Sequence, residues 1–402
     1  MPEIKTDCCI VGGGPAGLTL ALLLLRSGVE VAVVERGSSL ERSYRGEILQ
    51  PGGSRILDSL GVLDAAERRG ACRLSGFAFL AGDRQVFGID YGELPGPHNY
   101  LLAMPQRHLL AELLARCAEH PRFTYLPGNR VHALLRDGAR ITGVAITGDP
   151  ATTVHARVVV GADGRYSKVR QLAGVDNVRL ELFEQDLLWF RLRVPADRRP
   201  GRVEIGRGRG GAVLRHDSYP DFVQLGWTLP HRGYGAVADR GIDDVKAMIT
   251  ETVPQYADLI AEQIRDLGDL SLLDVFAATA DRWVRDGLVL IGDAAHTHGP
   301  LGAQGINLAI QDAALLHPVL VRALREDDQS EAVLGAFPAA RRPDVDRVMR
   351  VQTRQAEAMF AAAPSGPPAA RTARPPAAAD MTAWIAFGNP AITVHDELFL
   401  ES

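Results

Sequence analysis

The sequence predicts an α/β protein in which a Rossmann-like domain carries an inserted antiparallel β-sheet domain and is followed by a C-terminal helical segment. Three observations lead to this prediction. Residues 7–35 have the pattern strand, glycine turn, helix, strand, which is a βαβ unit. Residues 178–277 change to short alternating runs that glycine-rich turns separate. Residues 287–307 then give another apolar strand, which ends in a loop rich in glycine and alanine.

The composition is that of a globular protein with two or three domains, since the 402 residues are 46% hydrophobic and 23% charged. A net charge of −5 and the lack of a long basic block argue against a nucleic-acid partner. The apolar run Leu18–Leu25 is far shorter than the ~20 residues that cross a membrane, so we expect no membrane association. Four cysteines without metal-like spacing predict no metal site and fit a reducing cytoplasm.

The first unit contains a glycine turn with the spacing of a dinucleotide-binding site. Gly12 suits the tight bend, Gly14 lets a pyrophosphate approach the backbone, and Gly17 allows close packing of helix and strand. The helix start at Pro15-Ala16 offers free N–H groups to phosphates. Glu35 ends the next strand, where a carboxylate accepts hydrogen bonds from ribose hydroxyls. The expected order is a strand at 7–11, the turn, a helix to 27 and a strand at 30–34.

In the middle of the chain we expect helices at 52–69 and 106–119 and strands with turns at 76–99. The apolar strand Val158–Val160 leads into a second glycine-containing turn with Asp163. Asp163 has two interpretations of about equal weight: a cofactor contact, or an ordinary strand-to-helix turn that Asp163 or Ser167 caps.

The inserted segment reads as an antiparallel sheet with a helix at 245–267. Trp189, Arg191 and Arg193 share one strand face, because side chains alternate along a strand. That face either covers a substrate or meets solvent, and solvent is the favoured interpretation for the two arginines. Trp227 and Gln224 have opposite parity, so only one of them points at a pocket. For residues 207–211 a hairpin turn is favoured over a phosphate nest.

The stretch Ile291–Asn307 places a carboxylate, Asp293, at the end of an apolar strand and then a loop without bulky side chains. A second site of this kind is unnecessary for NAD alone but suits the longer FAD. Asp293 then accepts from a ribityl hydroxyl, and a helix that starts near Gly305 directs its positive end at the flavin edge that gains charge on reduction. Pro300 is either a flavin neighbour or a loop stiffener. For His296 and His298, a structural or cofactor-packing role is favoured over a catalytic one.

These three motifs in this order resemble the single-component FAD-dependent aromatic hydroxylases, whose type member is para-hydroxybenzoate hydroxylase. The segment around Arg45 and the helix start at Gln106 also match that family, and the resemblance covers residues 5 to 360. It implies a glutathione-reductase-type FAD-binding domain with a substrate sheet above the flavin. It assigns the cofactor to Gly12, Gly14, Pro15, Ala16, Gly17, Glu35, Arg36, Arg45, Gln106, Asp163, Gly292, Asp293, Pro300, Gly302, Gln304, Gly305, Ile306 and Asn307.

The resulting domain prediction gives 1–75, 101–177 and 278–340 to the FAD-binding domain, and 76–100 and 178–277 to the substrate domain. Residues 341–402 form a C-terminal helix and an Ala/Pro-rich tail. The candidate catalytic residues are Pro300, Arg191, Arg193 and Trp227. One departure from the family is Ala303, which stands where a glycine is common.

The resemblance implies a monooxygenase in which NAD(P)H, as a transient reductant, reduces FAD and O2 then forms a flavin C4a-hydroperoxide. That species hydroxylates an aromatic or polyketide-like small molecule, as in antibiotic biosynthesis. Reductase, epoxidase or Baeyer–Villiger chemistry on the same fold is the second interpretation. We expect a monomer or a homodimer.

Overall fold

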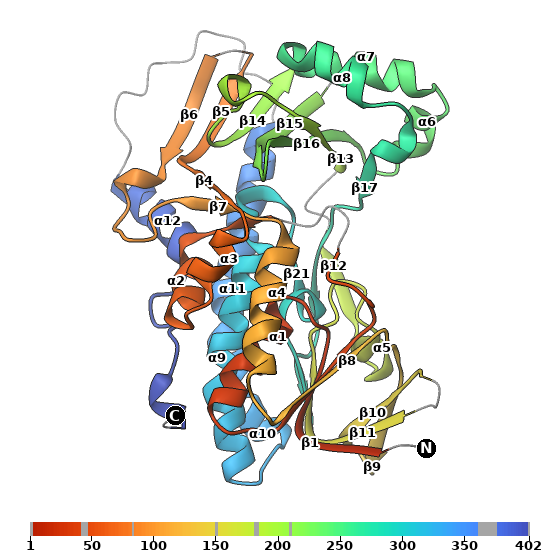
Figure 1. Ribbon diagram of the computed structural model, residues 1–402, viewed down its shortest axis with the longest axis vertical. Coiled ribbons are helices and arrows are strands. Elements are labelled where there is room, and N and C mark those ends of the chain that lie inside the picture. The colour runs from red at the N-terminus through yellow and green to blue at the C-terminus, as the bar shows by residue number, and fades with distance from the viewer. Residues whose placement is uncertain are drawn as a thin grey trace.

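The computed structural model describes residues 3–41, 47–82, 84–148, 152–180, 185–208, 211–360 and 376–400. An eight-stranded sheet and its helices form the lower part of the molecule in Figure 1, and a seven-stranded sheet forms the upper part. The chain crosses between the two parts more than once. Arg45, which the sequence assigns to the cofactor, lies outside the described residues.

The lower sheet is built around parallel strands. The order of six strands is β19-β20-β11-β1-β2-β8, and β10 and β9 extend it from β11. The pairs β20/β11, β11/β1, β1/β2 and β2/β8 are parallel. Their carboxyl ends therefore meet at one edge, where open α/β sheets bind ligands. The bounds are β1 Glu3–Val11, β2 Val31–Glu35, β8 Phe123–Pro127, β9 Val131–Asp137, β10 Arg140–Ile146, β11 Thr152–Gly161, β19 Val284–Arg285 and β20 Leu288–Leu290.

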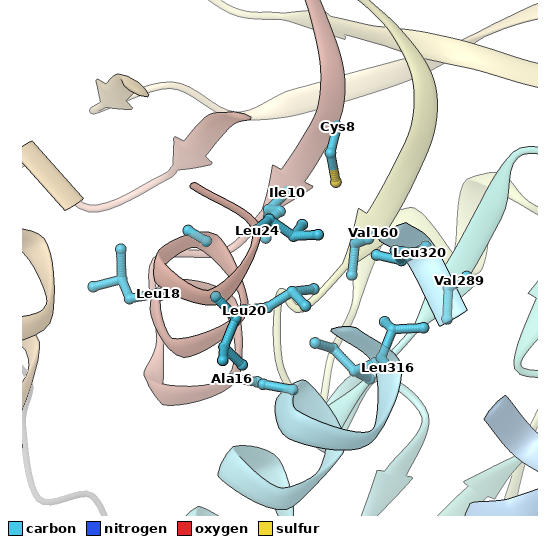
Figure 2. Close-up of a cluster of buried hydrophobic side chains, with 14 of the residues drawn as sticks. Cys8, Ile10, Ala16, Leu18, Leu20, Leu24, Val160, Val289, Leu316 and Leu320 are labelled. Carbon is cyan, nitrogen blue, oxygen red and sulfur yellow. The ribbon is translucent and has the colours of Figure 1, made fainter. Parts of the chain in front are cut away.

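The main core lies between this sheet and two helices, α1 (Pro15–Arg26) and α9 (Gly305–Arg325). Figure 2 shows Leu20 and Leu24 of α1 close to Leu316 and Leu320 of α9 and to Val160 of the sheet. Every residue of α1 from position 16 to 25 is buried. The apolar run seen in the sequence is therefore a core helix. Across the described residues no helix is both long and apolar enough to cross a membrane.

The upper sheet has the strand order β17-β13-β16-β15-β14-β5-β6. All its pairs are antiparallel except β14/β5. Gly208 pairs with Gly211 in adjacent antiparallel strands, while residues 209–210, the centre of the hairpin that the sequence predicts, lie outside the described residues. The bounds are β5 Gly76–Ala81, β6 Arg84–Asp90, β13 Gln185–Arg193, β14 Val203–Gly208, β15 Gly211–Ser218, β16 Phe222–Pro230 and β17 Ser271–Leu273.

Three helices cover the outer face of the upper sheet and enclose a second core (Figure 1): α6 (Tyr234–Ala238), α7 (Ile242–Thr252) and α8 (Ala257–Gln263). The single helix predicted at 245–267 is wrong, because it is two helices. Pro254 lacks a backbone N–H and starts a new turn, so the helix ends before it. The helix predicted at 52–69 is also divided, at Gly61, whose φ of +66° is a left-handed helix end.

The remaining elements connect the two parts. The helix predicted at 106–119 is confirmed as α4. The small strands are β3 Ile48–Leu49, β4 Cys72–Leu74, β7 Leu101–Ala103, β12 Asn177–Leu180, β18 Ala277–Ala280 and β21 His296–Thr297. The helices of this region are α2 Pro51–Ser59, α3 Leu63–Arg68, α4 Gln106–Ala118, α5 Lys168–Leu172 and α10 Glu331–Leu334.

The C-terminal part contains two further helices, α11 (Ala336–Phe360) and α12 (Pro376–Phe387). Residues 361–375 lie outside the described residues, and the rest of the tail that the sequence presents as loose, 376–379, is the first turn of α12. The segment after α12 returns to the N-terminal part, where Leu400 N donates to the carbonyl of Arg26. Gly28 has a φ of +77°, as expected after a helix end, and a side chain there would collide with Leu400.

Candidate functional site

A cavity of about 950 Å³ lies between the two sheets, at the carboxyl ends of the parallel strands. It brings together residues that lie nearly 300 positions apart in the chain. Of the residues that the sequence assigns to the cofactor, the cavity is lined by Gly12, Gly14, Pro15, Ala16, Glu35, Arg36, Gln106, Asp163, Gly292, Asp293, Pro300, Gln304, Gly305 and Ile306. Gly17, Gly302 and Asn307 belong to the same turns but are not part of the lining.

In the turn after β1, each of the three glycines is needed for a different reason. Gly12 has a φ of +117°, and a Cβ there would overlap the carbonyl group of Ala162. A Cβ on Gly17 would overlap the carbonyl oxygen of Gly12, so the helix packs directly on the turn. A Cβ on Gly14 would meet nothing within 4 Å. Gly12 and Gly17 are thus required by the fold, while Gly14 leaves backbone open to the cavity.

Glu35 is held rigidly at the end of β2. Its Oε2 accepts from the N–H of Gly13 at 2.7 Å, and its Oε1 accepts from the N–H of Gly37 at 2.8 Å. Glu35 is 5% exposed and lines the cavity. Its backbone partners tie the carboxylate to the glycine turn, which is the position a ribose-binding group requires.

Asp163 has the capping role that its sequence leaves open. Its Oδ2 accepts from the N–H groups of Lys168 and Val169 at 2.7 and 3.0 Å, and Ser167 Oγ donates to its Oδ1. Ser167 in turn caps α5 by accepting from Arg170 N at 2.9 Å. Burial raises the pKa of Asp163. The residue also lines the cavity, so it combines a structural role with a place at the site.

The loop after β20 forms the opposite end of the cavity. Asp293 Oδ2 lies 3.7 Å from Arg165 Nε, and its side chain remains 30% exposed and therefore accessible. Helix α9 begins at Gly305, as predicted, and the first turn of a helix leaves N–H groups without helical partners. The loop just before it contains Gly302 at φ +73° and Ala303 at φ +51°. Ala303 therefore holds the left-handed conformation that glycine adopts at little cost.

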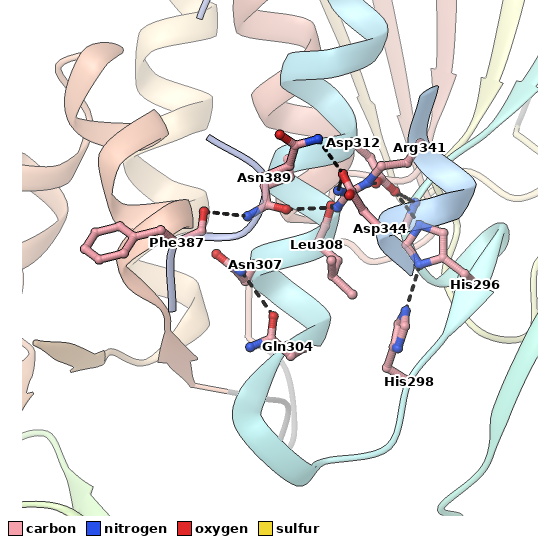
Figure 3. A network of polar contacts seen from close by, with 12 residues as sticks. His296, His298, Gln304, Asn307, Leu308, Asp312, Arg341, Asp344, Phe387 and Asn389 are labelled. Atoms are coloured by element: carbon pink, nitrogen blue, oxygen red, sulfur yellow. Dashed lines mark hydrogen bonds and ion pairs between the residues drawn. The ribbon is translucent and has the colours of Figure 1, made fainter. Parts of the chain in front are cut away.

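A buried ionic network fixes this loop from behind (Figure 3). Asp312 of α9 accepts from Gly292 N at 2.8 Å, contacts His296 Nε2 at 2.7 Å and accepts from Arg341 Nε at 2.7 Å. Burial raises the pKa of Asp312, but the charges and hydrogen bonds of His296 and Arg341 outweigh it and bring the pKa to about 2. His296 Nδ1 lies 3.1 Å from His298 Nε2. The network supports the structural interpretation of the two histidines.

Helix α11 completes the support of the loop. Gln352 Nε2 donates to the carbonyl oxygens of Gly299 and Leu301 at 3.1 and 2.6 Å. Burial, and then the charge of His296, lower the pKa of His298 to about 3, so His298 is neutral at pH 7. A neutral, buried imidazole that a second imidazole and α11 surround packs the loop and carries no charge to the cavity.

Sequence reasoning missed Gln50 and Tyr91. Gln50 is fully buried; its Nε2 donates to the carbonyl of Gly302 at 2.6 Å, and its Oε1 accepts from Tyr91 OH at 2.8 Å. This chain of hydrogen bonds connects the segment after β6 with the loop before α9. A lone glutamine and a lone tyrosine carry no motif, so only the three-dimensional arrangement reveals them.

The four catalytic candidates differ in whether they line the cavity. Pro300 lines the cavity. Arg191 and Arg193 are exposed, contact the ring of Phe222, and are not among the cavity-lining residues; Arg193 also pairs with Asp221. Trp227 is buried in the second core beneath α7 and α8. Trp227 is not among the cavity-lining residues, whereas Gln224, of opposite parity, lines the cavity.

The residues present fit FAD. One continuous cavity is lined both by the glycine turn at Gly14 and by the N-terminus of α9 at Gly305. In a bound FAD, the open backbone at Gly14 would suit the pyrophosphate, the carboxylate of Glu35 would suit ribose hydroxyls, and Asp293 would offer a further accessible acceptor. Asp186, His231 and Asp274 form a separate cluster in which Asp186 accepts from the N–H groups of Arg232 and Val275 and lies 2.9 Å from His231 Nδ1, while Asp274 accepts from Tyr166 OH at 3.0 Å.

The fold and the site together define a flavoprotein with a dinucleotide turn at one end of the cavity and a substrate-covering sheet at the other. The chain belongs to the FAD binding domain family, whose profile matches residues 5–352. It is 53% identical over 402 residues to a 6-methylpretetramide 4-monooxygenase of Streptomyces rimosus, covering 98% of this chain and 96% of that protein. The chain is therefore an FAD-dependent monooxygenase.

Other relatives agree with this class. A 12-dehydrotetracycline 5-monooxygenase/anhydrotetracycline 6-monooxygenase of Streptomyces rimosus subsp. rimosus is 31% identical, covering 88% of this chain and 70% of that protein. The crystal structure of P. aeruginosa PqsL in complex with 2-aminobenzoylacetate has a TM-score of 0.77 at 25% identity, covering 89% of this chain and 97% of that one. OxyS anhydrotetracycline hydroxylase from Streptomyces rimosus has a TM-score of 0.71 at 25% identity, covering 88% and 69%.

Proposed function

We propose that this enzyme hydroxylates an aromatic ring of a fused-ring polyketide of the pretetramide type, with NAD(P)H as the transient reductant. The observation that carries this proposal is the 53% identity, across nearly the whole of both chains, to a 6-methylpretetramide 4-monooxygenase. The cavity adds support, because the wall that the upper sheet contributes is mostly apolar and suits a flat aromatic molecule. Its apolar members include Phe77, Trp189, Val203 and Leu214.

The chain's own residues contribute binding and electrostatics to this reaction. FAD, when bound, supplies the oxidation–reduction chemistry and the activation of O2. The N-terminus of α9 opens into the cavity at Gly305 and Ile306, and its positive end favours the negative charge that a flavin ring gains on reduction. Pro300 and the upper sheet exclude water from the space where oxygen transfer occurs.

The position of the Trp189 side chain in the cavity wall depends on the glycine at position 226. A Cβ on Gly226, its cross-strand neighbour, would approach the indole ring of Trp189 to about 2.9 Å. The indole therefore lies across the strand at the glycine and presents its surface to the cavity. A flat aromatic wall of this kind favours stacking of a fused-ring substrate.

The test uses the purified FAD-loaded protein with 6-methylpretetramide, NADPH or NADH, and ¹⁸O2. We expect a product that carries one oxygen atom derived from O2, detected by mass spectrometry, and NAD(P)H consumption that the substrate stimulates. A control without NAD(P)H should give no product. A product without added oxygen would contradict the proposal and indicate a reductase. An epoxide would indicate an epoxidase, and a lactone would indicate Baeyer–Villiger chemistry.

A further inference from the structure

The cavity wall formed by the upper sheet is mostly apolar but contains two buried polar side chains. His216 of β15 and Gln224 of β16 both line the cavity, and they stand directly opposite each other in the antiparallel register of the two strands. Only 3% of His216 and 5% of Gln224 is exposed. Buried polar groups stabilise a fold only when they have partners, so two such groups on a ligand-facing wall point to a polar atom in the ligand.

The backbone determines which nitrogen of His216 is available to a ligand. Nδ1 lies 2.9 Å from the carbonyl oxygen of Asp217, and because a carbonyl only accepts, Nδ1 carries the hydrogen. Burial lowers the pKa of His216 to about 4, so the ring is neutral at pH 7 and Nε2 carries a lone pair. Nε2 has no hydrogen-bond partner among the described residues. It is also not fully enclosed by protein atoms. It is an accessible acceptor in the cavity wall.

We infer that His216 Nε2 accepts a hydrogen bond from a phenolic or enolic hydroxyl group of the substrate and so determines which ring of a fused-ring molecule is presented for hydroxylation. This inference rests on the proposed function. The lowered pKa makes His216 a poor base toward a phenol, so the residue orients the hydroxyl group and leaves its proton in place. The amide of Gln224 is placed to bind a neighbouring substrate oxygen.

The ligand side of the test compares 2-naphthol with its methyl ether, 2-methoxynaphthalene. The two have nearly the same shape, but only 2-naphthol donates a hydrogen bond. Binding to the FAD-loaded protein is measured by equilibrium titration. A site built to accept a hydrogen bond rejects the analogue that cannot donate one, so the wild type should prefer 2-naphthol severalfold. Equal affinity of the wild type for both ligands would overturn the inference.

The second part of the test uses two substitutions of His216 whose side chains differ in length. In His216→Asn the amide nitrogen can replace Nδ1 toward Asp217, but the acceptor in the cavity is lost. In His216→Gln an amide oxygen can reach the position of Nε2. We expect His216→Asn to weaken 2-naphthol binding about 3–10-fold and to leave the methyl ether within about twofold, and His216→Gln to restore part of the preference. A purely structural role would weaken both ligands equally, and that result would overturn the inference.

The matched control is His132→Asn, the same substitution at an exposed histidine of β9 outside the cavity lining, which should change neither affinity. The assay also separates this inference from the proposed function. Binding that depends on His216, without any oxygen transfer to 6-methylpretetramide, would contradict the function alone. Hydroxylation with unchanged regiochemistry and KM in His216→Asn would contradict the role of His216 alone. If His216→Asn does not fold, the wild-type preference and His216→Gln decide.

Discussion

Asp312 shows at the scale of one residue how the flavin loop, the segment 291–304 that we propose to contact the flavin, is fixed. It is fully buried and pairs with Arg341, which is also fully buried, and with His296. Replacing it by asparagine keeps the size but removes the charge, so the buried Arg341 would keep only the longer ion pair with Asp344 at 3.5 Å. We expect Asp312→Asn to lower the free energy of unfolding by about 3–5 kcal/mol, measured by urea denaturation at pH 7. Asp327→Asn, at an exposed pair with Arg157, should cost about 1 kcal/mol or less.

The same carboxylate has a defined dependence on pH. The pKa of Asp312 is lowered in the folded protein from 3.8 to about 2, so its stabilising effect is present above about pH 4 and is lost as the pH falls toward 2. The stability difference between the wild type and Asp312→Asn should therefore be constant near neutrality and shrink below about pH 4. A difference that instead narrows between about pH 8 and pH 5 would assign the effect to another group.

Asp293 and Asp163 are both carboxylates at strand ends, but their surroundings predict different roles. Asp293 is accessible from the cavity, whereas Asp163 accepts hydrogen bonds from the first turn of α5. Asp293→Ala should weaken FAD binding about 10–100-fold with little change in unfolding, measured by titrating apoprotein with FAD. Asp163→Ala should lower stability by about 1–2 kcal/mol through the lost cap. Unchanged FAD affinity in Asp293→Ala would refute the ribityl assignment.

The strand–turn–helix element at β1 and α1 allows a sharper comparison. Gly12 has a φ of +117° and a blocked Cβ position, whereas Gly14 has a φ of −86° and an open one. Gly12→Ala should therefore destabilise the fold by several kcal/mol. Gly14→Ala should fold normally and lose affinity for FAD, because its methyl group enters the space left for the ligand. The measurements are thermal unfolding of apoprotein and FAD titration, and similar stability of the two variants would contradict this division.

The elements also show how far sequence reasoning reaches. The glycine turn, Glu35 and the loop Ile291–Asn307 were predictable because each carries its function in a short contiguous stretch next to a clear strand. Helix breaks at Gly61 and Pro254 were missed because apolar periodicity continues across them. His216, Gln50 and Tyr91 were not predictable. The place of His216 in the cavity wall, and the hydrogen bonds from Tyr91 to Gln50 and from Gln50 to Gly302, depend on the packing of segments far apart in the chain.

In the upper sheet, too, the sequence alone does not determine which side chains face the cavity. Alternation correctly separates Trp227 from Gln224, but it cannot say which of the two faces the cavity. That choice depends on α7 and α8, which cover one face of the sheet and bury Trp227. Arg191 and Arg193 share a face with Trp189, yet only Trp189 lines the cavity, because the arginines lie further along β13 beside Phe222.

At the scale of the whole molecule, the C-terminal segment 376–400 returns to α2, to α11 and to the loop before α9. Gln304 Nε2 donates to the carbonyl of Ile385 at 3.0 Å, and Asn389 Nδ2 donates to Asp344 at 3.1 Å. A Cβ on Gly52 would overlap the carbonyl of Phe387, so α12 packs directly on α2. The segment 376–400 therefore supports the loop before α9 from outside, in addition to the support from α11.

Deleting residues 376–402 should consequently loosen the flavin loop without unfolding the parallel sheet. We expect faster hydrogen exchange at residues 298–306 and 50–59 and a severalfold higher dissociation rate of FAD, while exchange in β1 and β11 stays slow. Deleting only residues 401–402 is the control and should change none of these rates. Uniformly faster exchange across β1 and β11 would mean that the segment stabilises the whole molecule instead, since strands at the centre of the sheet open only in global unfolding.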